Sequence, residues 1–253
     1  MSLLEVQSLS KTFGGVAAVA EVSFELEAGH VHSVIGPNGA GKTTLFNLIA
    51  GAVRPSGGKV RLDGADITGL APHVLAERGI GRSFQTPQIF AAMSVAENVM
   101  VGRHLRLDRR LLPSLLGMPA VDRANRAARE RAQLLLDQVG LGQEADRPAG
   151  GLAYGAMKRL EIARALAGDP RLLLLDEPAA GLNPTETAEI TALIQAIAAA
   201  GVTVVLVEHD MRLVMAVSDH IIVLDSGRKL ADGTAAAIRA DPAVIAAYLG
   251  QAQ

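Results

Sequence analysis

The 253-residue sequence contains no cysteine and no tryptophan, and aromatic residues make up only 3% of it. The lack of cysteine excludes disulfide bonds, thiolate metal sites and a cysteine nucleophile. No apolar run approaches the roughly 18 residues that a membrane-spanning helix needs, and residues 1–6 lack the features of a signal peptide. The net charge of −2 gives no overall basic field for nucleic acid. We therefore expect a cytoplasmic protein that does not bind nucleic acid.

Apolar residues, in contrast, make up 49% of the chain, which is ample for a hydrophobic core. The length suits one large α/β domain or two small ones. Alternating residues 3–7 and 21–26 predict antiparallel strands, and residues 59–67 have the alternation and Asp-Gly turn of a hairpin. Asn183 and Pro184 are typical of a helix start, and residues 242–249 predict a closing amphipathic helix.

A glycine-rich segment between a strand-like run (31–35) and a helix-like run (45–50) carries the clearest chemistry. Its members are Gly36, Pro37, Asn38, Gly39, Ala40, Gly41, Lys42, Thr43 and Thr44. The glycines let backbone N–H groups converge on a polyphosphate at the positive end of the helix, Lys42 supplies a mobile charge, and the Thr43 hydroxyl can bind Mg²⁺. This segment, here called the cradle, predicts a nucleoside triphosphate site. The alternative is a glycine-rich turn that binds nothing.

Polar residues follow two runs that predict fully buried strands. Asp176 and Glu177 follow the run 171–175, and His209 follows the run 202–207. The carboxyl ends of parallel strands are where open α/β sheets bind their ligands. Asp176 is suited to hold Mg²⁺ through water, and Glu177 to polarise an attacking water. A lone histidine is usually structural, but its place at this edge of the sheet favours a function for His209.

Residues from about 89 to 165 have few strand signals and many helical ones, which predicts an inserted helical segment. Within it, residues 152–156 form a loop that leads into a helix, a second place where phosphate could bind. Phe90 and Met93 are expected to be exposed near the start of the insertion. Residues 103–131 hold eight arginines against three acidic residues; a solvated helix face is the favoured interpretation, and a surface for a partner or acidic lipid is the other. The arginines are Arg103, Arg106, Arg109, Arg110, Arg123, Arg126, Arg129 and Arg131.

The cradle, Gln85, the 152–156 loop, Asp176-Glu177 and His209, taken in this order, resemble the ATP-binding subunit of ATP-binding cassette (ABC) transporters over essentially the whole chain. The resemblance is closer still to branched-chain amino acid importers, through residues 81–85, 152–155, 179–184, 208–211 and 247–250. It implies an α/β fold with a RecA-like P-loop core (about 1–88 and 166–253), an antiparallel β layer and a helical subdomain (about 89–165), all within one nucleotide-binding domain.

The same resemblance implies roles for individual residues. Phe13, whose turn position otherwise suggests simple packing, would stack on adenine. Gln85 would sense the γ-phosphate and join Thr43 and Asp176 at the metal. Lys42, Glu177, His209 and Gln85 would be catalytic, with ATP and Mg²⁺ as cofactors. Ala153 and Gly155 would contact the ATP held by the opposite subunit of a head-to-tail dimer.

The implied partners are two transmembrane permease subunits, a second copy of this chain or a homologous ATPase subunit, and indirectly a periplasmic binding protein. The expected location is the cytoplasmic face of the membrane. The chain departs from the general Leu-Ser-Gly-Gly-Gln signature at Ala153, Tyr154 and Ala156, and Asn183 replaces the general family's aspartate. We expect the missing hydroxyl and amide to weaken the closed dimer.

Three other functions compete with import of branched-chain amino acids. Related engines move urea or lipopolysaccharide and look much alike. Soluble cassette ATPases that act on DNA or ribosomes usually carry paired cassettes or long coiled coils, and this sequence shows neither an internal repeat nor heptads. An unrelated phosphate-cradle kinase or GTPase would not be expected to have the 152–156 loop shortly before Asp176 and a histidine after a further strand.

Overall fold

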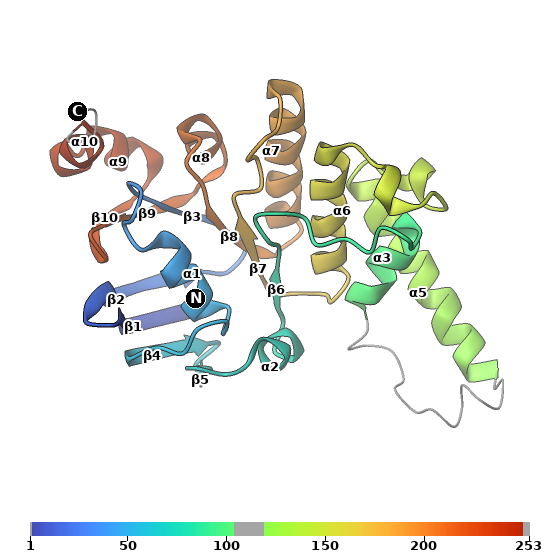
Figure 1. The fold of residues 1–253 in the computed structure, drawn as a ribbon, viewed down its shortest axis with the longest axis horizontal. Coiled ribbons are helices and arrows are strands. Elements are labelled where there is room, and N and C mark those ends of the chain that lie inside the picture. Colours follow the sequence, from blue (N-terminus) through green and yellow to red (C-terminus); the bar gives the residue numbers. More distant parts are fainter. Residues whose placement is uncertain (1, 104–118, 250–253) are drawn as a thin grey trace. The chain divides into compact units, whose positions relative to one another are not determined.

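A computed structural model describes residues 2–103 and 119–249 (Figure 1). It separates into two compact units, Met1–Ile80 with Arg171–Gln253, and Gly81–Pro170. Arg106, Arg109 and Arg110 of the arginine-rich segment, and Gly250 of the C-terminal motif, lie outside the described residues. None of the helices in the described ranges is long and apolar enough to cross a membrane.

The first unit contains a four-stranded antiparallel sheet in the order β2-β1-β4-β5. The two antiparallel strands and the hairpin that the alternating sequence predicts are all present here, and the turn between β4 and β5 has Asp63 and Gly64 at positive φ. The strands are β1 (Ser2–Phe13), β2 (Val16–Glu27), β4 (Gly57–Leu62) and β5 (Ala65–Asp66).

A second sheet has the order β10-β9-β3-β8-β7-β6, and its central strands β9, β3, β8 and β7 run parallel. Strands β3, β7 and β8 are buried at every position, which explains their almost uninterrupted apolar sequence. The chain passes from the first unit to the second within β6. The strands are β3 (Val31–Ile35), β6 (Ile80–Arg82), β7 (Leu172–Asp176), β8 (Thr203–Val207), β9 (His220–Asp225) and β10 (Arg228–Gly233).

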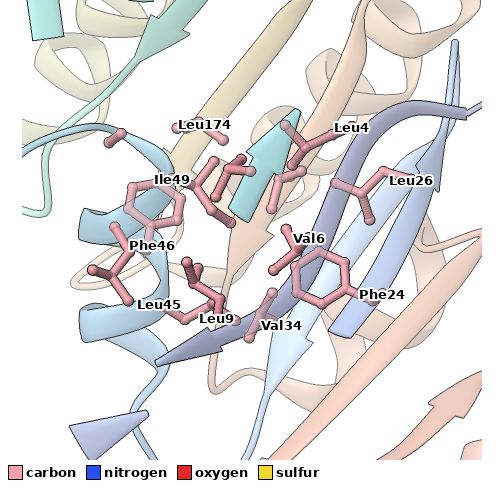
Figure 2. Packing of buried hydrophobic residues seen from close by; sticks show 14 of the residues in the cluster. Leu4, Val6, Leu9, Phe24, Leu26, Val34, Leu45, Phe46, Ile49 and Leu174 are labelled. Carbon is pink, nitrogen blue, oxygen red and sulfur yellow. The ribbon is translucent and has the colours of Figure 1, made fainter. Parts of the chain in front are cut away.

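Helix α1 (Lys42–Ile49) packs into the main hydrophobic core between the two sheets. Its side chains Leu45, Phe46 and Ile49 are buried with Leu4 of β1 and Leu174 of β7, among others (Figure 2). Because α1 begins where the cradle ends, this packing fixes the cradle to both sheets. The remaining helices of the unit are α2 (Pro72–Glu77), α7 (Pro184–Ala199), α8 (Met211–Val217), α9 (Ala235–Ala240) and α10 (Pro242–Leu249).

The second unit is helical, and the three α-helices among its described residues pack against one another (Figure 1). They are α3 (Val95–Gly102), α5 (Pro119–Gln138) and α6 (Tyr154–Leu166), with short 3₁₀ turns at η2 (Gly142–Glu144) and η3 (Ala149–Gly151). Two arginines of the arginine-rich segment, Arg103 and Arg131, form ion pairs with Asp169 at 3.7 and 3.0 Å, and the Arg131 side chain is 41% exposed. The predicted helical segment 89–165 falls within this unit.

Candidate nucleotide site

The cradle is the loop between β3 and α1, and its backbone requires glycine at particular positions. Gly36 and Gly41 have φ of 149° and 97°. A Cβ atom at Gly36 would lie 2.1 Å from the carbonyl oxygen of Leu224, and one at Gly41 would lie 2.4 Å from that of Ala18. Both glycines are therefore needed for conformation and for close packing. The loop is held between β2 and β9 while its N–H groups lead into the start of α1.

Lys42 is the first residue of α1, and its side chain turns back over the cradle. Its Nζ donates to the carbonyl oxygens of Gly36 and Pro37 at 2.7 and 2.9 Å. Partial burial lowers the pKa of Lys42, and the charge of Glu177 partly offsets that effect. Lys42 therefore lies within electrostatic reach of Glu177. Thr43, next to it, is exposed at the helix start.

Asp176 and Glu177 follow one another at the carboxyl end of β7. Asp176 is buried and pairs in register with Val207 of β8. Glu177 has a φ of 45°, and its N–H donates to the Val207 carbonyl at 3.0 Å. His209 lies just beyond β8, with its Nδ1 3.9 Å from Oε2 of Glu177. The structure thus brings Lys42, Asp176, Glu177 and His209 to one edge of the sheet.

Glu208 holds this edge together, a role that the sequence did not reveal. Its side chain is 1% exposed. One carboxylate oxygen accepts from the N–H of Ala179 at 2.9 Å, and the other accepts from the N–H groups of His209 and Asp210 at 3.0 and 3.3 Å. Glu208 therefore ties the loop after Glu177 to the loop that carries His209. The fully buried strand before it was the only available signal, because a carboxylate at that depth must have backbone donors.

Phe13 lies at the end of β1, and its side chain is 49% exposed. Phe13 pairs with Val16 of β2. Two residues further along β2, the carbonyl oxygen of Ala18 lies beside Gly41 of the cradle. At about 3.3 Å per residue, two residues of strand separate Val16, the pairing partner of Phe13, from Ala18. The Lys11 ammonium lies 4.9 Å from the ring centroid.

Gln85, Ala153 and Gly155 belong to the second unit. The Gln85 carbonyl oxygen accepts from Nζ of Lys158 at 2.6 Å. Ala153 is exposed at the N-cap position of α6 and makes no side-chain capping bond, whereas Gly155 is buried in the first turn. Met93, expected to be exposed, is partly buried because its carbonyl oxygen accepts from the N–H of Ala149 in η3.

Sequence comparison places these residues in a known family. The ABC transporter profile matches residues 19–180, and a profile described as branched-chain amino acid ATP-binding cassette transporter matches residues 228–253. The chain is 50% identical to the high-affinity branched-chain amino acid transport ATP-binding protein BraF of Pseudomonas aeruginosa, over 99% of this chain and 98% of that protein. It is 46% identical to LivG of Escherichia coli over the same shares. It is also 37% identical to the lipopolysaccharide export protein LptB of Acidithiobacillus ferridurans, over 98% and 97%.

Solved structures match equally well in fold. An ABC transporter cassette in its ADP conformation superposes with a TM-score of 0.86 at 34% identity, covering 99% of this chain and all of that one. A dimeric cassette bound to ADP and phosphate superposes with a TM-score of 0.78 at 25% identity, covering 92% and 98%. The predicted α/β class with a P-loop core and a helical insertion is thus confirmed. The chain belongs to the ABC transporter family, as an ATP-binding, ATP-hydrolysing cassette.

Proposed function

We propose that this chain is the ATP-hydrolysing subunit of a branched-chain amino acid importer. The observation that carries the proposal is the combination of 50% identity over nearly the full length to BraF with the match of residues 228–253 to the branched-chain amino acid profile. The ABC transporter profile alone would support any transported substrate.

In this proposal the cradle binds the phosphates of ATP through its backbone N–H groups and Lys42. Lys42 Nζ donates to two carbonyl oxygens of the cradle at 2.7 and 2.9 Å, and it would exchange these acceptors for phosphate oxygens when ATP binds. Phe13 offers an exposed ring for the base.

The donor set at this edge suits Mg²⁺. Thr43 offers a hydroxyl and Asp176 a carboxylate, both hard oxygen ligands, and Gln85 is the third proposed ligand. When bound, Mg²⁺ neutralises charge that develops on the phosphate oxygens.

Glu177 is the proposed general base, and His209 the residue that orients the water and the γ-phosphate. Glu177 sits at the edge reached by Lys42, and its carboxylate lies 3.9 Å from His209 Nδ1. The left-handed backbone at Glu177 is held by the bond from its N–H to Val207, so the direction of the side chain is fixed before substrate binds. General base catalysis contributes about 10² to 10⁴ in rate.

We further propose a head-to-tail dimer with a second copy or a homologous subunit, in which Ala153 and Gly155 face the partner's ATP. Two permease subunits would hold this dimer at the cytoplasmic face of the membrane and receive substrate from a periplasmic binding protein. The N-terminus of α6 supports the contact with phosphate, because its first N–H groups point outward from the helix start.

Lipopolysaccharide export is the second candidate, since the chain is 37% identical to LptB over almost its whole length. Reconstitution of the chain with the permeases and the binding protein of a branched-chain amino acid importer would test the first candidate. We expect ATP-dependent accumulation of labelled leucine, isoleucine or valine in vesicles and no uptake of urea. Vesicles that hydrolyse ATP but take up none of leucine, isoleucine and valine would contradict the proposal.

A further inference from the structure

Two charged side chains on α6 are buried, and a third, Arg164, is only partly exposed. Lys158, Glu161 and Arg164 are spaced three residues apart and therefore share one face of the helix. The residues Lys158 and Glu161 are 2% and 1% exposed. The Arg164 side chain is 15% exposed. Burying charged groups is costly unless each is bonded to a partner, so their partners indicate what the row does.

All three side chains bind the backbone of one loop, residues 84–88, which lies outside the helices and strands. Lys158 Nζ donates to the carbonyl oxygen of Gln85 at 2.6 Å. The N–H of Gln88 donates to Oε1 of Glu161 at 3.2 Å, and Arg164 Nη1 donates to the Gln88 carbonyl. Arg164 also lies 3.5 Å from Oε1 of Glu161.

These bonds restrict movement of the 84–88 loop relative to α6. Burial raises the pKa of the Glu161 carboxyl, while the bond from the Gln88 N–H and the nearby charge of Arg164 lower it. The Arg164 guanidinium lies 5.9 Å from the ring centroid of Phe90, just beyond the loop. Helix α6 thus contacts the loop from Phe84 to Phe90.

The other end of α6 carries the residues that are proposed to face the partner's nucleotide. Ala153 is its N-cap, and Gly155 lies in its first turn. The Lys158 ammonium lies 5.7 Å from the Tyr154 ring, which continues the row toward that end. A helix of this length is rigid, so a loop bonded to its face moves with its N-terminus.

We propose that Lys158, Glu161 and Arg164 are positioning residues that fix the main chain of Gln85 to the helix carrying Ala153 and Gly155. The proposal rests on the proposed roles of Gln85 at its own nucleotide and of Gly155 at the partner's. The α6 helix then places Gln85 for hydrolysis whenever its N-terminus docks on the opposite subunit.

The test compares Lys158→Met and Glu161→Leu with the wild-type chain assembled with its permeases. We expect kcat for ATP to fall roughly 10- to 100-fold in each, the range that a small misplacement of a reacting group produces, with the affinity for ATP unchanged within about twofold. Hydrogen exchange at the Gln88 amide should speed up, because its acceptor Glu161 is lost or displaced. Glu161→Gln, which keeps the acceptor oxygen, should restore both the protection and kcat.

Leu160→Ala is the matched control, because Leu160 is a fully buried apolar side chain on the same helix. It should lower the melting temperature while leaving kcat and Gln88 exchange near wild type. Wild-type kcat or unchanged Gln88 protection in folded Lys158→Met and Glu161→Leu would overturn the positioning role. A Gln85→Ala variant measured in parallel distinguishes failure of the proposed role of Gln85 from failure of the positioning role. Normal hydrolysis in Gln85→Ala would refute the role of Gln85. Slow hydrolysis in Gln85→Ala together with normal hydrolysis in Lys158→Met would refute only the positioning role.

Discussion

Oε2 of Glu177 lies 3.9 Å from Nδ1 of His209, although the two residues are on loops that follow different strands. One backbone conformation and one side chain create this proximity. Glu177 adopts a φ of 45°, and Glu208 binds the N–H groups of both Ala179 and His209. The relationship places a carboxylate and an imidazole on the side of the sheet where Lys42 ends the cradle.

Lys42→Ala should raise the Kd for Mg-ATP by at least about 10- to 100-fold, because it removes charge-assisted bonds worth about 1.5–3 kcal/mol. Isothermal titration calorimetry measures the affinity directly. Lys59→Ala, at an exposed position on β4, is the control for loss of one lysine and should bind normally. An unchanged affinity in Lys42→Ala would remove the cradle's lysine from the nucleotide site.

His32 should make the chain less stable as the pH falls below about 6.5. Burial lowers its pKa, and the neighbouring charges of His220 and His30 lower it further, while the Glu27 carbonyl and Asp219 raise it. Between the lowered pKa of His32 in the folded chain and its ordinary pKa of 6.5, the unfolded chain binds more protons than the folded chain. The contribution of His32 to the free energy of unfolding is therefore fully present above pH 6.5, and it is lost as the pH falls through the folded pKa.

For one such group the slope is at most about 1.4 kcal/mol per pH unit. Urea unfolding between pH 5 and 8 would measure it, with His32→Gln as the variant that keeps a donor but does not titrate. The variant should show a shallower slope than wild type. Parallel curves for the two proteins would show that His32 contributes nothing to the pH dependence.

Ala153→Ser, in a Glu177→Gln background, should tighten the ATP-bound dimer. A hydroxyl at the N-cap of α6 can accept from the helix and still donate to the partner's phosphate. One such bond at each of two sites, at about 1.5 kcal/mol or more each, lowers the dimer Kd by roughly 100-fold if the sites are independent. Sedimentation in Mg-ATP would report the dimer fraction.

Capping alone would also stabilise the monomer, so thermal unfolding without nucleotide is measured beside it. A higher melting temperature with an unchanged dimer fraction would mean that position 153 does not face the opposing phosphate. Equal dimer fractions would also remove this sequence's support for the head-to-tail arrangement.

Phe90→Asp should uncouple transport from ATP hydrolysis. Phe90 is 48% exposed beside the loop of Gln85, and an exposed aromatic side chain is suited to anchor a helix from a permease. We expect the basal ATPase to remain within about twofold, while uptake in reconstituted vesicles falls at least about tenfold. Leu134→Asp, at a 62% exposed position on α5, is the matched control. Normal uptake with Phe90→Asp would place the permease contact elsewhere.

Patterns of apolar residues predicted the parts of the fold that local chemistry determines. The runs before the cradle, Asp176 and Glu208 are buried strands, and Asn183 caps α7 with a reciprocal bond to Glu186, as its sequence indicates. Residues whose role depends on a distant partner were not predictable. Glu208 has a clear role only because Ala179, from another loop, lies beside it.

The row on α6 shows the same limit more sharply. In sequence, Lys158, Glu161 and Arg164 are charged residues at helical spacing, which is typical of a solvated face. They are buried because the backbone of residues 84–88, about 70 residues earlier in the chain, supplies bonding partners.

Glu177→Gln is the sharpest test of Glu177 as the general base for ATP hydrolysis, because it removes the base and keeps the shape of the side chain. Single-turnover hydrolysis and ATP binding should be measured on the same preparation, with Glu77→Gln, an exposed carboxylate on α2, as the control. The account predicts that hydrolysis falls by about 10² to 10⁴ while ATP affinity is retained and an ATP-bound dimer accumulates. Hydrolysis near the wild-type rate, with only monomer present in ATP, would show that another residue is the base.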